Sequence, residues 1–344
     1  MTRIKDIAMK AGVSTATVSH VLNNTGRVGE ETRNNVLQVI NELNYTPNRI
    51  AKSLKMKKTS TVGIIAEDVT VFNTPEIIDG INDVAGTYDL GIILVNLRIE
   101  KKMGTDFSNK DQLRTLITKA FEQLDMNQVD GIIYIGTYNR DVTDVIPSTS
   151  LPVVYTYCNT TNETDYTDNY DDDKGAYDAT KHLIDLGHRE IALISGFIDS
   201  IHTHDRFNGY RRALMDHGIP LNPLYIKTGD WEIDSGYQLT KELLVSPERP
   251  TAIVALNDLM AYGSITAAEE MGLQLPRDLS IVGFDNRELS GFTSPRLTTM
   301  SIPLHKMGEK SLEILHSLIN NRLSAERRIK LNCDLVKRDS VSKL

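Results

Sequence analysis

Short runs of β-branched and other apolar residues recur along most of this chain, and they constrain its fold more than any other feature. They lack the alternation of apolar and polar residues seen in half-exposed strands, so they are typical of parallel strands covered on both faces. Amphipathic segments of helical period lie between them, which predicts a series of βα units. The apolar runs are TVGIIA, LGIILVN, DGIIYIG, LPVVYTY, EIALISG, TAIVALN and LSIVGFD, and the helical segments include PEIIDGINDVAG, DKGAYDATKHLIDLG, DRFNGYRRALMDHG and DSGYQLTKELL. These units fill roughly 280 residues, more than one domain usually holds, so we expect an α/β body of two doubly wound subdomains.

The residues before this body carry a different pattern, that of three short amphipathic helices. Gly12 breaks the first helix and Ser14 can cap the second. The helical spacing predicts an all-α core of Ile4, Ile7, Ala8, Ala11, Val18, Val21, Leu22, Val36, Val39, Ile40 and Leu43. The opposite side of the second helix presents Thr15, Ala16, Thr17 and His20, as in a helix-turn-helix whose recognition helix enters a major groove. A helical pair that only packs against itself would share the pattern of the first two helices.

Charge separates the same two regions. Residues 1–58 hold ten Lys and Arg against four Asp and Glu, whereas the remainder holds 28 basic and 42 acidic residues. The overall net charge of −8 therefore hides a basic head, which is the footprint expected of a surface that neutralises phosphates. A basic face that is merely solvated is the simpler alternative.

Several classes of protein are disfavoured. The chain has no apolar run of the ~20 residues that a membrane span needs, and it starts on a predicted helix, so we expect no membrane contact and a cytoplasmic location. Cys158 and Cys333 are far apart and lack metal-ligand spacing, so we expect two buried, reduced thiols, no metal site and no cofactor.

The acid-rich segment from Glu163 to Asp173 lacks the spacing of a calcium loop and is expected to be a solvated connection ending at a helix start. The spacings of GxSxG, GxGxxG, HExxH and the P-loop are missing, which disfavours an enzyme. A solute-binding protein would leave the basic head without a purpose.

Several segments make the chain resemble the LacI/GalR family of bacterial transcription repressors: AGVSTATVSHVLNN, EETRNNVLQVINELNYTPN and RIAKSLK, followed by TVGIIA, GHREIALISG, GDWEIDSGY, ALNDLMAYG, SIVGFDN and RDSV. The resemblance implies a homodimer that binds double-stranded DNA at a near-palindromic operator, with a small-molecule effector in a body of the periplasmic-binding-protein fold. It also implies a helix-turn-helix head at 1–47, a hinge helix and linker at 48–59, and an effector-binding and dimerisation domain at 60–344. Within that domain, one subdomain would hold about 60–160 with 293–320, and the other about 161–292 with 321–344.

The hinge segment is too short to be a stable helix alone in water, so we expect its order to depend on DNA. By resemblance, the hinge helices of two subunits meet in the minor groove, where Ala51 and Leu54 face the bases and Leu54 acts as an apolar wedge that kinks the duplex. Leu54 could instead make a hydrophobic contact with the body. The DNA-binding residues expected here, beside those of the recognition helix, are Asn48, Ala51, Leu54 and Lys55.

Ligands of doubly wound folds lie at the carboxyl ends of the strands, so residues just past each strand are candidates for an effector site. By this rule and the resemblance, the expected contacts are Phe72, His202, Arg206, Trp231, Asn257 and Asp285. An aromatic ring beside a guanidinium, a carboxylate and an amide suits a polyhydroxylated ligand. Each residue has a simpler alternative: Arg206 could pair with Asp205, Asn257 and Asp285 could cap helices, and Trp231 could belong to the core.

We expect the effector to be a sugar, because purine-type members of the family carry an Arg where this chain has Ser200. A nucleoside or purine effector remains an alternative, as does regulation by a phosphocarrier protein. His20 stands where many members have Arg, which leaves the preferred base open. The segment VTVFNTPEI departs from the usual Asn-Pro-Phe pattern after the first strand of the body, which weakens the assignment of Phe72.

Overall fold

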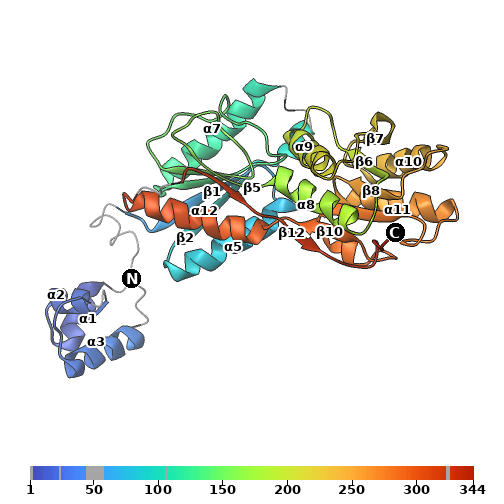
Figure 1. Cartoon of the computed structure of the whole chain (residues 1–344). Helices are drawn as coiled ribbons and strands as arrows, with labels where there is room; N and C mark the ends of the chain where they lie inside the picture. Colours follow the sequence, from blue (N-terminus) through green and yellow to red (C-terminus); the bar gives the residue numbers. More distant parts are fainter. Residues whose placement is uncertain (1–2, 23–24, 44–57, 105–106, 108, 323–325) are drawn as a thin grey trace. The chain divides into compact units, whose positions relative to one another are not determined.

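The computed structural model describes residues 3–22, 25–43, 58–104, 107, 109–322 and 326–344. The chain forms two compact units, Met1–Thr59 and Ser60–Leu344 (Figure 1). The hinge residues Asn48, Ala51, Leu54 and Lys55 lie outside the described residues.

The described residues of the first unit form the helices α1 (Ile4–Ala11), α2 (Thr15–Leu22) and α3 (Glu30–Glu42). Gly12 ends α1 in the left-handed conformation, with φ of 68°. The Ser14 hydroxyl oxygen accepts a hydrogen bond from the Thr17 N–H at 3.0 Å, which satisfies a free donor at the start of α2. Ile7, Val18 and Val36 are fully buried where the helices meet. The predicted three-helix core is confirmed.

The second unit holds two six-stranded sheets. The first has the order β11-β5-β4-β3-β1-β2 and is wholly parallel. Its strands are β1 (Thr61–Ala66), β2 (Gly91–Asn96), β3 (Ile132–Ile135), β4 (Val153–Thr156), β5 (Tyr166–Tyr170) and β11 (Arg328–Leu331). Helices α5 (Asn73–Thr87) and α12 (Leu304–Ile319) pack together, and α6 (Ile99–Met103) and α7 (Lys110–Met126) complete this half.

The second sheet has the order β12-β10-β9-β8-β6-β7, in which β12 alone is antiparallel to its neighbour. Its strands are β6 (Ile191–Ser195), β7 (Ile226–Thr228), β8 (Ala252–Ala255), β9 (Ser280–Asp285), β10 (Thr298–Ser301) and β12 (Asp334–Val336). Helices α8 (Asp172–Asp185) and α9 (Ile201–Asp216) form one pair, and α10 (Ile233–Leu244) and α11 (Asp258–Glu270) form another. Short 3-10 turns occupy Pro223–Tyr225 and Glu288–Gly291. Each predicted apolar run forms a strand, which confirms the expectation of two doubly wound halves.

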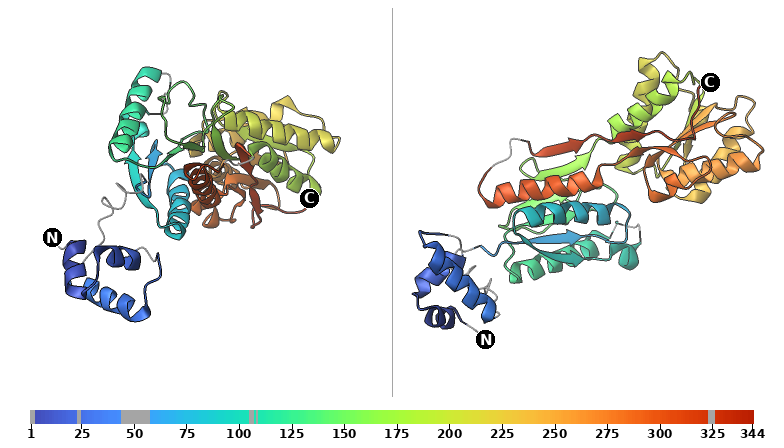
Figure 2. Two further views of the ribbon diagram at one scale, coloured as in Figure 1. Left: turned by 90° about the vertical axis from the view of Figure 1, so that its left-hand side faces the viewer. Right: turned by 90° about the horizontal axis from the view of Figure 1, so that it is seen from below.

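The chain crosses between the halves later than the resemblance implied. The strand orders place the crossings after β5, β10 and β11. The right-hand view of Figure 2 shows the chain running between the two halves. Residues 161–170 therefore belong to the first half, because β5 pairs with β4 and β11. Residues 293–301 belong to the second half, because β10 pairs with β9 and β12. Residues 328–331 return to the first half as β11, so the expected subdomain bounds are corrected at all three crossings.

Strand β5 also corrects the expected solvated connection between Glu163 and Asp173. Its sequence YTDNY is polar, yet all five residues are buried. Asp168 accepts a hydrogen bond from the Ser311 hydroxyl at 3.0 Å, and the Asn169 amide donates to the Cys158 carbonyl at 2.8 Å. Hydrogen bonds to groups inside the protein allow these polar side chains to be buried in the sheet. The composition of this segment alone would not predict a strand.

Helices α5 and α12 approach closely through a pair of glycines. A Cβ atom added at Gly80 would lie 2.0 Å from the His305 carbonyl oxygen, and one at Gly308 would lie 2.0 Å from the Ile77 carbonyl oxygen. Both positions therefore require glycine, since real Cβ atoms do not come so near to backbone. This contact fixes how α12 lies on the first sheet.

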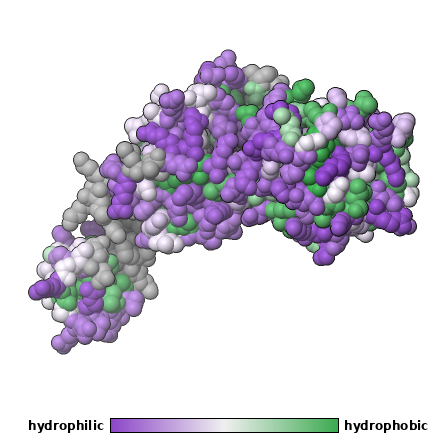
Figure 3. All heavy atoms as spheres, viewed as in Figure 1, coloured by the Kyte–Doolittle hydropathy of each residue, from purple (hydrophilic) through white to green (hydrophobic). Residues whose placement is uncertain are grey.

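The surface is mostly hydrophilic in the view of Figure 3, with hydrophobic side chains scattered among polar ones. Within the described ranges, helices long and apolar enough to cross a membrane are absent. Cys158 and Cys333 are both buried and free, and burial raises the pKa of each thiol. The expectation that both thiols are buried is confirmed.

Candidate functional site

The outer side of α2 carries the residues expected to read DNA. Thr15, Ala16 and His20 are exposed, and Thr17 is half-buried. The Thr17 and Ser14 hydroxyl oxygens are 2.9 Å apart, so part of the hydrogen-bonding capacity of Thr17 is used within the turn. The His20 Nδ1 atom lies 3.2 Å from the Thr25 hydroxyl, which orients the ring. The three exposed side chains remain accessible on one surface, while their role in binding stays a prediction.

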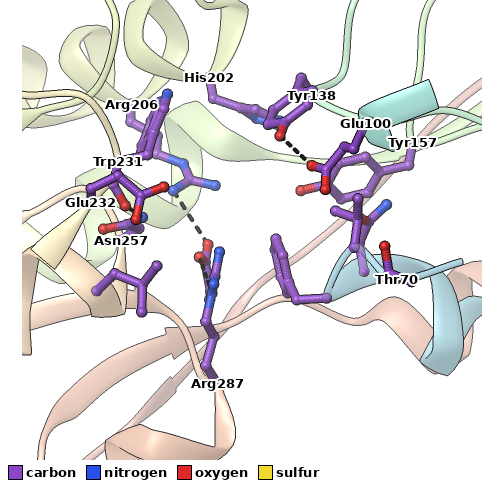
Figure 4. Close-up of a pocket in the computed structure, with 15 residues that line it drawn as sticks. Thr70, Glu100, Tyr138, Tyr157, His202, Arg206, Trp231, Glu232, Asn257 and Arg287 are labelled. Atoms are coloured by element: carbon purple, nitrogen blue, oxygen red, sulfur yellow. Dashed lines mark hydrogen bonds and ion pairs between the residues drawn. The ribbon is translucent and has the colours of Figure 1, made fainter. Parts of the chain in front are cut away.

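A cavity of about 320 Å³ lies between the carboxyl ends of the two sheets (Figure 4). Its walls come from residues that follow β1, β2, β3 and β4 in the first half and β6, β7, β8 and β9 in the second. These residues are Thr70, Val71, Phe72, Asn73, Glu100, Tyr138, Tyr157, His202, Arg206, Trp231, Glu232, Asn257, Leu259, Asp285 and Arg287. We call this cavity the inner cavity. All six residues expected to contact an effector line it, although their sequence positions span more than half of the chain.

Arg206 is the centre of the charged network in this cavity. It is 2% exposed, and its Nε donates to the Asp172 carboxylate at 2.6 Å, not to Asp205. Its other nitrogens reach the Leu256 carbonyl oxygen, the Tyr170 hydroxyl at 2.9 Å and Asp285 at 3.5 Å. The guanidinium carbon lies 3.7 Å from the centre of the Phe284 ring. These contacts fix the guanidinium and compensate its burial.

Asp172 holds Arg206 and His202 together. The His202 Nδ1 atom lies 2.8 Å from the other Asp172 oxygen. Burial alone would raise the pKa of Asp172, but its attraction to His202 and Arg206 outweighs burial and holds that pKa below its ordinary value. Burial raises the pKa of Asp285, against the opposing attraction of Arg206 and Arg287. Arg206 at the cavity wall is thus held between two carboxylates of different acidity, Asp285 in the lining and Asp172 behind it.

Trp231 lies flat against the backbone of Gly196. A Cβ atom at Gly196 would fall 1.9 Å from the indole, so glycine leaves the space that the ring occupies. Trp231 packs against the core and also lines the cavity. It therefore has features of a core residue and of a cavity residue. Its φ of 74° is unusual for a bulky residue. Tyr138, Tyr157 and Asp285 line the same cavity with φ of 60°, 56° and 107°, and such clusters of strained backbone are characteristic of ligand sites.

The capping alternative is confirmed for Asn257 and not for Asp285. The Asn257 side-chain oxygen accepts from the Met260 N–H at 2.8 Å at the start of α11, and its amide donates to the Trp231 carbonyl at 2.8 Å. Asn257 therefore positions Trp231 as well as the helix. Asp285 instead pairs with Arg206 at 3.5 Å and Arg287 at 3.3 Å.

Sequence reasoning missed several lining residues. Arg287 places its guanidinium carbon 4.2 Å from the centre of the Phe72 ring, a contact between the two halves that also puts Phe72 at the cavity. The Tyr138 hydroxyl donates to Glu100 at 2.7 Å. Tyr157 is the last residue of the predicted run LPVVYTY, and Arg287 lies two residues past LSIVGFD, so the strand-end rule could have found both. Glu232 follows β7, whose three-residue sequence IKT gives little strand signal.

Within the part of the chain that the structure describes, clusters of three or more His, Cys, Asp or Glu suited to a metal ion are absent. The side chains that line the inner cavity can bind a polar ligand by hydrogen bonds and stacking.

Comparisons with known proteins agree with this arrangement. Residues 3–48 match the family model described as bacterial regulatory proteins, lacI family, and residues 180–341 match a periplasmic binding protein-like domain. The HTH-type transcriptional repressor PurR of Photobacterium profundum is 35% identical over 348 residues, covering 100% of both chains. Catabolite control protein A of Priestia megaterium is 36% identical over 319 residues, covering 92% of each.

Solved structures show the same likeness. The lac repressor dimer bound to operator and the anti-inducer ONPF superposes with a TM-score of 0.77 at 28% identity, covering 99% of both chains. The complex of the transcriptional regulator CelR with cellobiose gives a TM-score of 0.67 at 26% identity, covering 99% of this chain and 100% of that one.

Proposed function

The chain belongs to the LacI family of bacterial transcription repressors, and from this premise we propose that it is a repressor whose operator affinity is set by a sugar bound in the inner cavity. The observation that carries the proposal is the cavity itself, which takes residues from the carboxyl ends of both sheets. A ligand there would touch both halves at once. It could therefore change how the halves sit against each other, which is the kind of differential contact that allostery requires.

Unpartnered polar atoms support a hydroxyl-rich ligand. Among the described residues, the Asn73 side-chain oxygen and the His202 Nε2 atom are buried without a hydrogen-bond partner, and both residues line the inner cavity. Buried polar groups are rarely left in this state, so a bound ligand is a natural source of their partners. Sugar hydroxyls both donate and accept, and the apolar face of a sugar ring can stack on Trp231.

The DNA-binding part of the proposal rests on the head. Thr15, Ala16 and His20 would contact base edges in the major groove, while the hinge segment, with Leu54 as its wedge, would enter the minor groove. Two such heads, supplied by a homodimer, would match a near-palindromic operator. Binding to chromosomal DNA implies a cytoplasmic protein.

A purine effector is the second candidate, because PurR proteins are among the relatives that match the full chain. Phe72 and Trp231 bring aromatic rings from the two halves, which would suit a flat base. Against it, Ser200 stands where purine-type members carry Arg. Regulation by a phosphocarrier protein is disfavoured by a cavity that is already furnished with polar contacts.

A thermal-shift screen of the full-length protein separates these candidates. Hexoses and their methyl glycosides form one set, and purine bases and nucleosides form the other. A ligand that binds only the folded state raises the melting temperature by mass action. We expect a sugar to raise it and purines to leave it unchanged; the reverse pattern would replace the sugar by a purine.

The location of the effector is tested by fluorescence, since Trp231 is the only tryptophan. Binding should change its emission, and Trp231→Ala should weaken binding by about 1–3 kcal/mol if stacking matters. A ligand that raises the melting temperature of wild type and of Trp231→Ala equally, without changing emission, would place the effector elsewhere.

A further inference from the structure

A second cavity of about 430 Å³ adjoins the inner cavity, and we call it the outer cavity. Tyr138 and Trp231 line both cavities. The outer cavity is otherwise surrounded mainly by Phe107, Phe197, Ile201 and Arg140. The effector contacts expected from sequence, other than Trp231, lie on the inner side alone.

The outer cavity presents mainly aromatic and apolar surface, with few free hydrogen-bonding groups. The Phe107 and Tyr138 rings are 5.7 Å apart in an edge-to-face arrangement, and the guanidinium carbon of Arg140 lies 4.4 Å from the centre of Phe107. Arg140 is also paired with the fully buried Glu67, so its charge is already compensated. The Tyr138 hydroxyl is engaged by Glu100. Asp199 and Ser200 are the remaining polar lining residues, too few for the hydroxyls around a second sugar ring.

Phe197 is the residue that makes this space unusual. It follows β6 and is 46% exposed, although large aromatic side chains are normally covered. The next residue, Ile198, is 73% exposed and does not line the outer cavity. A ligand group in the outer cavity would cover the Phe197 ring, whereas it would leave Ile198 in water.

From this geometry we propose that the outer cavity is a subsite for a flat aromatic substituent, so that the effector is an aryl glycoside. Its sugar ring occupies the inner cavity, and its aglycone passes between Tyr138 and Trp231 to stack among Phe107 and Phe197. Aromatic groups favour edge-to-face and offset contacts of the kind that these rings offer. The inference rests on the proposed sugar-binding function of the inner cavity and defines its ligand further.

The test is calorimetry on the full-length protein with methyl and phenyl β-glycosides of glucose and galactose. For the sugar that binds, the phenyl glycoside should bind roughly tenfold more tightly than the methyl glycoside, because only the phenyl ring reaches the outer cavity. Phe197→Ala should remove this advantage and leave the affinity for the methyl glycoside unchanged. Ile198→Ala is the matched control and should alter neither.

The possible failures are distinguishable. Equal affinity for the two glycosides, or an equal loss of both in Phe197→Ala, would overturn the subsite while leaving the sugar proposal intact. A gain for the corresponding disaccharides, cellobiose or lactose, as large as that for the phenyl glycosides would assign the outer cavity to a second sugar ring instead. Failure of every glycoside to bind, with purines binding, would overturn the sugar proposal and the subsite together.

Discussion

The acidic and basic residues buried at the wall of the inner cavity are held by one another, so single substitutions should have large effects. Arg206 compensates Asp172 and Asp285, both of which are buried. Removing one member of a buried ion pair leaves the other charge without compensation.

We predict that Arg206→Ala lowers the free energy of unfolding at pH 7 by about 3–5 kcal/mol and abolishes effector binding. Part of the lost stability should return at lower pH, where the two carboxylates become protonated. Urea denaturation at several pH values measures this effect. Arg211→Ala is the control, because Arg211 is an exposed arginine in the same helix; comparable losses in both variants would contradict the role given to the buried network.

Asp168 makes a separate contribution that depends on pH. Burial raises the pKa of Asp168 to about 8, against the hydrogen bond from Ser311. Since this pKa is higher in the folded than in the unfolded chain, the folded state binds the extra proton between about pH 4 and 8, and stability falls as pH rises through that window.

Asp168→Asn should therefore be close to wild type in stability at pH 5 and more stable than wild type at pH 8, by on the order of a few kcal/mol. Denaturant unfolding at pH 5, 6, 7 and 8 gives the comparison, with exposed Glu163→Gln as a control that should follow wild type. Parallel pH profiles for Asp168→Asn and wild type would show that the carboxyl stays ionised.

At the scale of elements, the pairing of helices depends on glycines that no hydrophobic pattern reveals. Gly80 in α5 faces the backbone of α12, whereas Gly86 in the same helix has nothing within 4 Å of an added Cβ. We predict that Gly80→Ala destabilises the body by about 1–3 kcal/mol, because α12 must move. Gly86→Ala should be neutral or stabilising by up to about 1 kcal/mol, because alanine favours the helix. Thermal unfolding of both variants measures the difference, and equal melting temperatures would show that the helices are not locked at Gly80.

The elements that sequence predicted are those whose pattern reflects burial alone. The apolar runs of β1 to β4, β6, β8 and β9 are fixed by the need to cover both faces of a parallel sheet. Strand β5 could not be recognised, because Asp168 accepts from Ser311 and Asn169 donates to the Cys158 carbonyl, and only the tertiary fold brings these partners near. Short strands such as β7 and β12 carry too few residues for a period to be seen.

Part of the candidate site was predictable because apolar strands can be recognised from their sequence. Arg206, Asn257 and Asp285 follow apolar strands, so the strand-end rule places them at one edge. The alternative that Arg206 pairs with Asp205 is wrong. Its partner is Asp172, which is distant in sequence and becomes a neighbour only because α8 packs on α9.

At the scale of the whole molecule, the separation of a basic head from an acidic body predicts separable activities. Residues 60–344 have their own sheets and cores, so a chain lacking residues 1–59 should fold and bind the effector without binding operator DNA. Gel-shift and calorimetric titrations test the two activities. For the intact protein, operator affinity should fall steeply with salt, by a slope of about −0.9 per neutralised phosphate. A truncated body that still shifts operator DNA would contradict the assignment of the head.

The most direct test of the account is a thermodynamic cycle read through Trp231. The emission of full-length protein is titrated with the sugar or glycoside selected by the thermal-shift screen, with and without saturating operator DNA, and operator affinity is measured with and without that ligand. Coupling between two sites is reciprocal, so both ratios should agree, with a value of roughly 5- to 150-fold. A sugar that changes Trp231 emission but has the same affinity in both states, and leaves operator affinity unaltered, would contradict the claim that the inner cavity controls DNA binding.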